Sequence, residues 1–252
     1  MKLLLTISYL GTNYHGFQVQ PNAVTVQSTL QDAVEKIFGV RCPVTGCSRT
    51  DSGVHANMFC CTVDTAEAQN ILSPQNALRA LNSVLPEDIA VLKAAEVPDS
   101  FHPRYDVLKK RYIYLIRNSQ IRNPFTPDRE FFYPHHLDEE KMNSAAAHFI
   151  GEHDFAAFCA SGSSVKDTVR TIYECNVCRN GDTVKLVICG NGFLYNMVRI
   201  ITGTLIEVSS GKITENEIDE IILSRDSSRA GYTAPACGLY LDYVTYPEGI
   251  NE

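Results

Sequence analysis

TVQSTLQDAVEKIFG, at residues 25–39, is a helical stretch, and it follows the strand-like stretch KLLLTISY at residues 2–9. The apolar residues of the first stretch recur every three or four positions, as on one face of a helix. Thr25 is a suitable N-cap residue and Gly39 a suitable stop. The other elements predicted for the first half are strands at 41–46, 57–63 and 88–95 and a helix from Ser73 to Leu85. Their order is βαββαβ.

The second half of the chain repeats this order. Its predicted elements are strands at 110–117, 171–179, 183–190 and 239–246, helices at 138–151 and 197–208, and an added short helix at 215–223. Asn180-Gly181 is typical of a two-residue hairpin. The sequence therefore predicts an α+β fold of two ferredoxin-like (RRM-like) domains, 1–103 and 104–252, joined near Pro98 and Pro103. We expect antiparallel sheets side by side, helices on one face of each, and a cleft between the domains.

Composition limits the class of protein. The chain has 252 residues, of which 44% are hydrophobic, and a formal net charge of −7. We find no apolar run of about 18 residues, the length of a membrane helix, and expect a soluble, cytoplasmic protein. Nine cysteines, an odd number, argue against a disulfide framework. The negative net charge does not exclude a nucleic acid, because basic residues can gather on one face.

The loop GCSRTDSGVHA, at residues 46–56, brings Arg49, Asp51 and His55 together between two predicted strands. Asp, Ser and Gly also favour turns for backbone reasons alone, so the loop has a purely structural interpretation. The alternative is a catalytic carboxylate, with Arg49 holding Asp51 ionised. A neighbouring arginine lowers the pKa of an aspartate by about 1–3 units. We interpret His55 as a residue that tethers the loop by a hydrogen bond, not as a catalytic group.

The segment from Ser48 to Ala56 closely resembles the signature of the TruA family of tRNA pseudouridine synthases. Further segments resemble that family in the same order along nearly the whole chain: YLGTNYHGFQ (9–18), TVQSTL (25–30), FHPRY (101–105), KRYIY (110–114), NGFLYNMVR (191–199) and APACGLYL (234–241). The resemblance implies an RNA uridine isomerase that detaches uracil from the ribose and rejoins it through C5. No cofactor and no metal are implied.

The resemblance also implies site residues. Asp51 corresponds to the essential catalytic residue, and Tyr112 to a tyrosine that stacks on the target base. Arg49 matches an arginine that helps to extrude the base or hold the RNA backbone. Arg199 matches an arginine that approaches the catalytic aspartate, which predicts an Asp51–Arg199 ion pair in the cleft. Leu239 matches a position that packs near the target uracil.

The substrate implied is tRNA, at uridines 38 to 40 of the anticodon arm, and the implied assembly is a homodimer without membrane contact. The residues add two expectations of their own. Tyr114 shares a strand face with Tyr112, and we interpret it as a core residue. The basic stretch Lys109-Lys110-Arg111 is either a solvated face or a phosphate-contacting rim. Further arginines that would extend this rim are Arg79, Arg104, Arg117, Arg122, Arg170, Arg225 and Arg229.

Two departures from the family pattern leave the RNA target open. Ser48 stands where the family usually has glycine, and Ser52 where it usually has alanine. Alternative functions are therefore a paralogue that acts on another RNA such as ribosomal RNA, a non-catalytic RRM-like RNA-binding protein, and a metabolic enzyme with a small substrate. A zinc site at Cys175 and Cys178 is disfavoured, because no second ligand pair follows and strand geometry points the two thiols to opposite faces.

Overall fold

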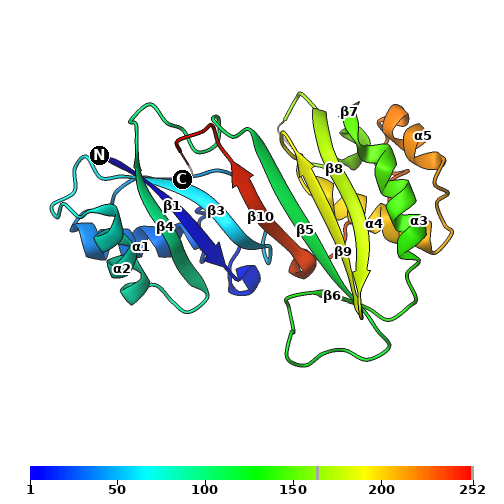
Figure 1. The fold of residues 1–252 in the computed structure, drawn as a ribbon, viewed down its shortest axis with the longest axis horizontal. Helices are drawn as coiled ribbons and strands as arrows, with labels where there is room; N and C mark the ends of the chain where they lie inside the picture. The colour runs from blue at the N-terminus through cyan, green and yellow to red at the C-terminus, as the bar shows by residue number, and fades with distance from the viewer. Residues whose placement is uncertain (163–164, 251–252) are drawn as a thin grey trace. The chain divides into compact units, whose positions relative to one another are not determined.

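The computed structural model describes residues 1–162 and 165–250. Its chain forms two compact units: a first unit of Met1–Leu108 together with the C-terminal segment from Tyr240, and a second unit of Lys109–Leu239 (Figure 1). This division differs from the predicted boundaries, which left residues 104–108 and the C-terminal strand in the second domain. The strand belongs with the first unit because Tyr240 and Leu241 pair in parallel with His55 and Ala56.

The first unit contains one mixed sheet and two helices. Its elements are β1 Lys2–Tyr9, α1 Val26–Phe38, β2 Val44–Gly46, β3 His55–Asp64, α2 Pro74–Val84, β4 Ile89–Val97 and, from Tyr240 onward, β10 Leu239–Thr245. The central strand β1 pairs antiparallel with β3 on one edge and β4 on the other. The free edge of β3 is shared: β2 pairs with its C-terminal end and β10 with its N-terminal end. The loop between β2 and β3 carries the predicted catalytic residue.

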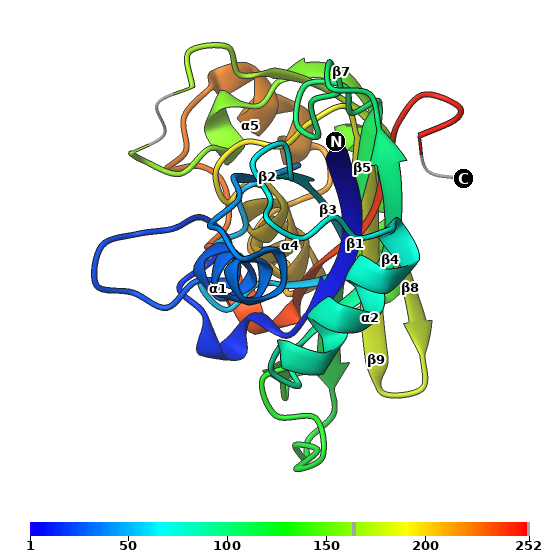
Figure 2. The same ribbon diagram turned by 90° about the vertical axis from the view of Figure 1, so that its left-hand side faces the viewer.

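Local sequence explains α1 well. The Thr25 hydroxyl accepts a hydrogen bond from the Ser28 N–H, and the Ser28 side chain accepts one from the Thr25 N–H, so a complete capping box begins the helix. Gly39 ends it at φ 76°, a left-handed conformation that suits glycine. The helix buries Leu30 and Phe38 completely. It lies next to α2 (Figure 2), and the predicted cap and stop residues are both confirmed.

In its described residues, the second unit contains five strands and three α-helices. Its elements are β5 Lys109–Asn118, β6 Phe131–Tyr133, α3 Glu139–Ala146, β7 Gly151–Asp154, β8 Val169–Asn180, β9 Thr183–Gly190, α4 Met197–Ser209 and α5 Glu217–Ser224. The strand order is β5-β9-β8-β7, with β6 parallel to β5. The β8–β9 hairpin is confirmed, but Asn180 pairs directly with Thr183, so the turn residues are Gly181 and Asp182.

Every predicted helix and strand overlaps an observed one, and the mixed α+β class is confirmed. Two short strands were not predicted, β6 and β7, because three or four residues carry too little periodicity to read. Within the described ranges, no helix is long and apolar enough to cross a membrane.

Candidate active site

The loop between β2 and β3 is fixed by backbone hydrogen bonds on both sides of Asp51. Before it, the Thr50 carbonyl accepts a hydrogen bond from the Phe17 N–H at 3.1 Å. After it, the Gly53 N–H donates to the Tyr14 carbonyl at 3.3 Å. Both partners belong to the segment that follows β1. The position of the Asp51 backbone is therefore set by a second stretch of chain and not by the loop alone.

Two glycines allow this close approach. A Cβ atom on Gly11 would lie 2.0 Å from the Val54 carbonyl oxygen, and one on Gly16 would lie 2.4 Å from the Thr50 carbonyl oxygen. Gly16 also has φ +83°, in the left-handed region that favours glycine. A side chain at either position would push the two segments apart and displace the loop.

His55 anchors the end of the loop. Its side chain is fully buried, its Nδ1 accepts the Gly11 N–H at 2.9 Å, and its ring lies 4.7 Å from that of Tyr240. Because Nδ1 is an acceptor, the ring carries its proton on Nε2. The predicted tethering role of His55 is confirmed.

The side chains of the loop divide between interior and surface. Thr50 is 8% exposed, and its hydroxyl lies 2.9 Å from that of Tyr9. Arg49 and Ser52 are exposed, and Asp51 is half-buried. A carboxylate on such a fixed, accessible backbone can act as a nucleophile or a base without first being ordered.

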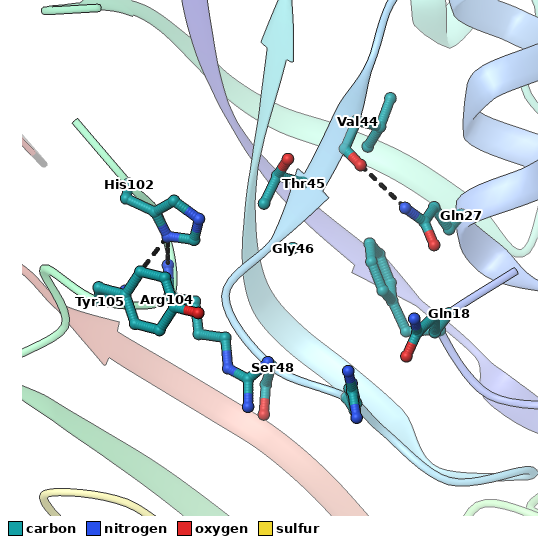
Figure 3. Close-up of a pocket in the computed structure, with 11 residues that line it drawn as sticks. Gln18, Gln27, Val44, Thr45, Gly46, Ser48, His102, Arg104 and Tyr105 are labelled. Atoms are coloured by element: carbon teal, nitrogen blue, oxygen red, sulfur yellow. Dashed lines mark hydrogen bonds between the residues drawn. The ribbon is translucent and has the colours of Figure 1, made fainter. Parts of the chain in front are cut away.

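A pocket of about 250 Å³ opens beside this loop, within the first unit. Arg49 is among its lining residues. His102, Arg104 and Tyr105 also line it (Figure 3). The Tyr105 ring is stacked on that of His102, with centroids 4.3 Å apart. We predicted Arg49 and Arg104 as possible RNA contacts, but we did not predict a pocket here. The adjacent Arg104 and Tyr105 pair, a cation beside an aromatic residue, is the feature of the sequence that indicates it.

Tyr112 and Tyr114 lie on β5 of the second unit. Tyr114 is fully buried and its hydroxyl donates to the Pro235 carbonyl at 2.6 Å, which confirms it as a core residue. Burial raises its pKa above the ordinary range. Tyr112 is only 6% exposed and packs edge-on against Phe193 at 5.0 Å. Its stacking on a base stays a prediction.

Arg199 lies near the start of α4. Its Nε donates to the Ala234 carbonyl at 2.7 Å and its Nη1 to the Asn196 side-chain oxygen at 2.9 Å. These bonds orient the guanidinium group. Leu239 is 6% exposed at the start of β10.

The predicted site residues are divided between the two units. Asp51 and Arg49 belong to the first unit, and Tyr112, Arg199 and Leu239 to the second. The Asp51–Arg199 ion pair therefore stays a prediction.

The predicted basic rim is weakened by internal pairing. Arg117 pairs with Asp182 at 2.8 Å, Arg225 with Asp154 at 3.0 Å, and Arg229 with Glu220 at 3.1 Å. Lys109 and Arg111 are exposed. A rim for phosphate would depend on the remaining basic residues.

The two candidate zinc ligands point apart. Cys175 is buried and Cys178 is exposed. This is the geometry expected for side chains three apart on a strand.

Comparison with known proteins assigns this architecture to a class. A family model described as tRNA pseudouridine synthase matches residues 5–106 and 145–247. The chain belongs to the tRNA pseudouridine synthase family, and the predicted TruA membership is confirmed. It is therefore an enzyme, an isomerase.

Full-length relatives agree. The chain is 47% identical to tRNA pseudouridine synthase A of Thermoanaerobacter sp. (strain X514), over 97% of this chain and 99% of the relative. It is 48% identical to the protein of that name from Acetivibrio thermocellus, over 96% and 98%. It is 44% identical to the Bacillus pumilus protein of that name, over 98% of this chain and 99% of the relative. Among solved structures, a Cbf5-Nop10-Gar1 complex matches at a TM-score of 0.37 with 14% identity, over 93% of this chain and 47% of that one.

Proposed function

We propose that this chain converts uridine to pseudouridine in the anticodon stem-loop of tRNA, at positions 38 to 40, with Asp51 as the catalytic residue. The observation that carries the catalytic assignment is the fixed backbone on both sides of Asp51, at Thr50 and Gly53. The relatives named tRNA pseudouridine synthase A supply the substrate class.

The reaction rearranges bonds without changing composition. The bond between C1′ and N1 of the uridine breaks, the base turns, and a bond forms between C1′ and C5. C5 releases its hydrogen as a proton to solvent, and N1 gains a proton. No electrons are exchanged with another molecule. An ionised carboxylate suffices, whether it attacks the sugar, attacks the base or removes a proton from C2′.

Other residues receive roles in this proposal. Tyr112 stacks on the extruded base, since an aromatic ring replaces part of the lost base stacking. Arg199, oriented by Asn196 and Ala234, pairs with Asp51 and keeps it ionised. Leu239 packs against the uracil, and Arg49 contacts the RNA backbone.

The finer architecture is also part of the proposal. We infer two ferredoxin-like domains, supported in the first unit by the order β1-α1-β2-β3-α2-β4 and the antiparallel pairing of β4, β1, β3 and β2. The assembly proposed is a homodimer, which light scattering of the purified protein would test.

Tritium release from tRNA labelled as [5-³H]uridine tests the chemistry directly, because C5 loses its hydrogen only when C1′ becomes bonded there. We expect release by the wild type from tRNA with uridines at 38 to 40, and at least about a 1,000-fold lower rate with Asp51→Asn and Asp51→Ala, the loss expected when a nucleophile or base is removed. Circular dichroism and tRNA binding serve as controls for folding.

Each contrary result has a distinct meaning. Full activity of Asp51→Asn would overturn the catalytic assignment. A wild type that binds tRNA but releases no tritium, and is active on ribosomal RNA, would overturn the proposed substrate. Release that persists when uridines 38 to 40 are replaced by cytidine would overturn the proposed positions.

A further inference from the structure

The pocket beside Arg49 is locally cationic in an acidic protein. The chain as a whole has a net charge of −7. The lining of this pocket nevertheless includes Arg49 and Arg104 and contains no Asp or Glu. A concave site with two arginines and no carboxylate suits an anionic ligand such as a phosphate group.

The stacked rings of His102 and Tyr105 form an aromatic platform that lines this pocket. The Tyr105 side chain is 75% exposed, although it is stacked on His102 with an interplanar angle of 30°. The Arg104 guanidinium carbon lies 6.0 Å from the centre of the Tyr105 ring. An exposed tyrosine beside an arginine is an arrangement on which nucleobases stack.

The platform is held in place before any ligand binds. The His102 Nδ1 accepts hydrogen bonds from the backbone N–H groups of Arg104 and Tyr105, at 3.2 and 3.3 Å. The backbone N–H of His102 donates a hydrogen bond to the Asp106 carboxylate at 2.8 Å. Figure 3 shows the His102 and Tyr105 rings lying against each other at the pocket. The His102 ring and the backbone at Arg104 and Tyr105 therefore need no reordering when a ligand binds.

Hydrogen bonds also fix the lining residues Gln27 and Val44. The Gln27 amide nitrogen donates to the Val44 carbonyl at 2.8 Å, and its oxygen accepts the Val19 N–H at 2.9 Å. Phe17 is stacked on Phe59 at 4.2 Å. The pocket is therefore preformed, as ligand sites usually are.

The pocket lies near Asp51, the proposed catalytic residue. Arg49 lines the pocket and precedes Asp51 by two residues. Because consecutive Cα atoms are about 3.8 Å apart, those of Arg49 and Asp51 lie within about 7.6 Å of each other. A ligand that contacts Arg49 therefore binds near Asp51, the residue that we propose reacts with the target uridine.

We infer that this pocket binds one nucleotide of the substrate RNA adjacent to the target uridine. Its base stacks on Tyr105, and Arg104 and Arg49 contact its phosphate. The inference deepens the proposed function and rests on it for the identity of the RNA. The pocket is distinct from Asp51 and Tyr112, to which the target base is assigned.

Binding of a fluorescently labelled anticodon stem-loop, and separately of whole tRNA, tests the inference. Anisotropy is measured in an Asp51→Asn background, so that turnover does not change the RNA. Tyr105→Leu removes the ring, Tyr105→Phe keeps it, and Tyr173→Leu is the matched control, since Tyr173 is 52% exposed on β8. All of these side chains are exposed, and thermal unfolding checks that each variant folds.

We expect Tyr105→Leu to weaken binding of both RNAs about tenfold, the usual effect of losing one stacked base, and Tyr105→Phe and Tyr173→Leu to stay within about twofold of the background. Arg104→Ala should reduce the slope of log Kd against log salt by about 0.7, the value for one phosphate of a single strand.

Equal binding by Tyr105→Leu and Tyr173→Leu would overturn the inference. A loss seen with whole tRNA but not with the stem-loop would place the bound nucleotide elsewhere and also overturn it. Tritium release by the wild type is measured in parallel. A wild type that binds RNA without releasing tritium contradicts the proposed function, while the binding series still decides the role of the pocket.

Discussion

Gly16 shows how single residues determine the geometry of the candidate active site. Its φ of +83° and the 2.4 Å approach of the Thr50 carbonyl leave no room for a Cβ atom. Thr50 precedes Asp51, so a side chain at Gly16 acts directly on the position of the proposed catalytic carboxylate.

We therefore expect Gly16→Ala to destabilise the fold by about 2–4 kcal/mol, the sum of left-handed strain and a steric clash, and to lower tritium release. Gly211→Ala is the matched control, because Gly211 has φ +74° with nothing within 4 Å. It should cost only about 1–2 kcal/mol and leave release unchanged. Urea unfolding and the tritium assay measure both effects. Equal stability of the two variants would show that the segment relaxes without cost.

At the scale of elements, the start of α1 is connected to the loop that carries Asp51. The Val26 N–H donates to the Gly16 carbonyl at 3.2 Å, and the Gln27 N–H donates to the Phe17 carbonyl at 2.9 Å. Phe17 in turn donates to Thr50. Fraying of the first turn of α1 would therefore loosen the segment that supports the loop.

Thr25→Ala removes the capping box and should lower the free energy of unfolding by about 1 kcal/mol. Thr25→Ser keeps a hydroxyl at the cap and should lose less than half of that. We also expect a larger decrease in tritium release for Thr25→Ala than for Ser73→Ala, which removes the cap of α2 away from the loop. An equal loss of activity in the two cap variants would show that the start of α1 does not support the Asp51 loop through Gly16 and Phe17.

At the scale of the whole molecule, buried thiols make stability depend on alkaline pH. Burial raises the pKa of Cys60 from 9.0 to about 12, and it also raises the pKa values of Cys61 and Cys175. In the unfolded chain these thiols ionise above about pH 9, whereas in the fold they stay protonated. Unfolding then releases protons, so stability is full below pH 9 and falls as the pH rises toward 12.

Each such thiol contributes a slope of up to about 1.4 kcal/mol per pH unit in this window. We expect Cys60→Ser to have a shallower decline between pH 9 and 11 than the wild type. Cys178→Ser, at an exposed position, should follow the wild type. Urea unfolding under reducing conditions at several pH values provides the comparison. Parallel curves of unfolding free energy against pH for the wild type and Cys60→Ser would show that ionisation of Cys60 does not cause the decline.

Elements that have local causes could be predicted from the order of the residues. The cap at Thr25 and the stop at Gly39 depend on neighbours a few residues away, and both were predicted. The strand at 2–9 was also predicted, but the expected alternation is not observed, because residues 3–7 are all buried. The motif around Asp51 indicated the family together with six further segments that follow the family's order along the chain. His55 was correctly interpreted as a tether from its place in that loop.

The contacts between distant segments could not be predicted and are known from the fold. The parallel pairing of β10 with β3, the contact of Gly11 and Gly16 with the loop that carries Asp51, and the pocket formed by Arg49 with His102 and Tyr105 all join residues 34 or more positions apart. Such contacts depend on the packing of whole elements, since no local pattern records which strand edge or loop will be adjacent. The family motif indicated that Asp51 is the reactive residue, and the tertiary contacts explain how its backbone is held.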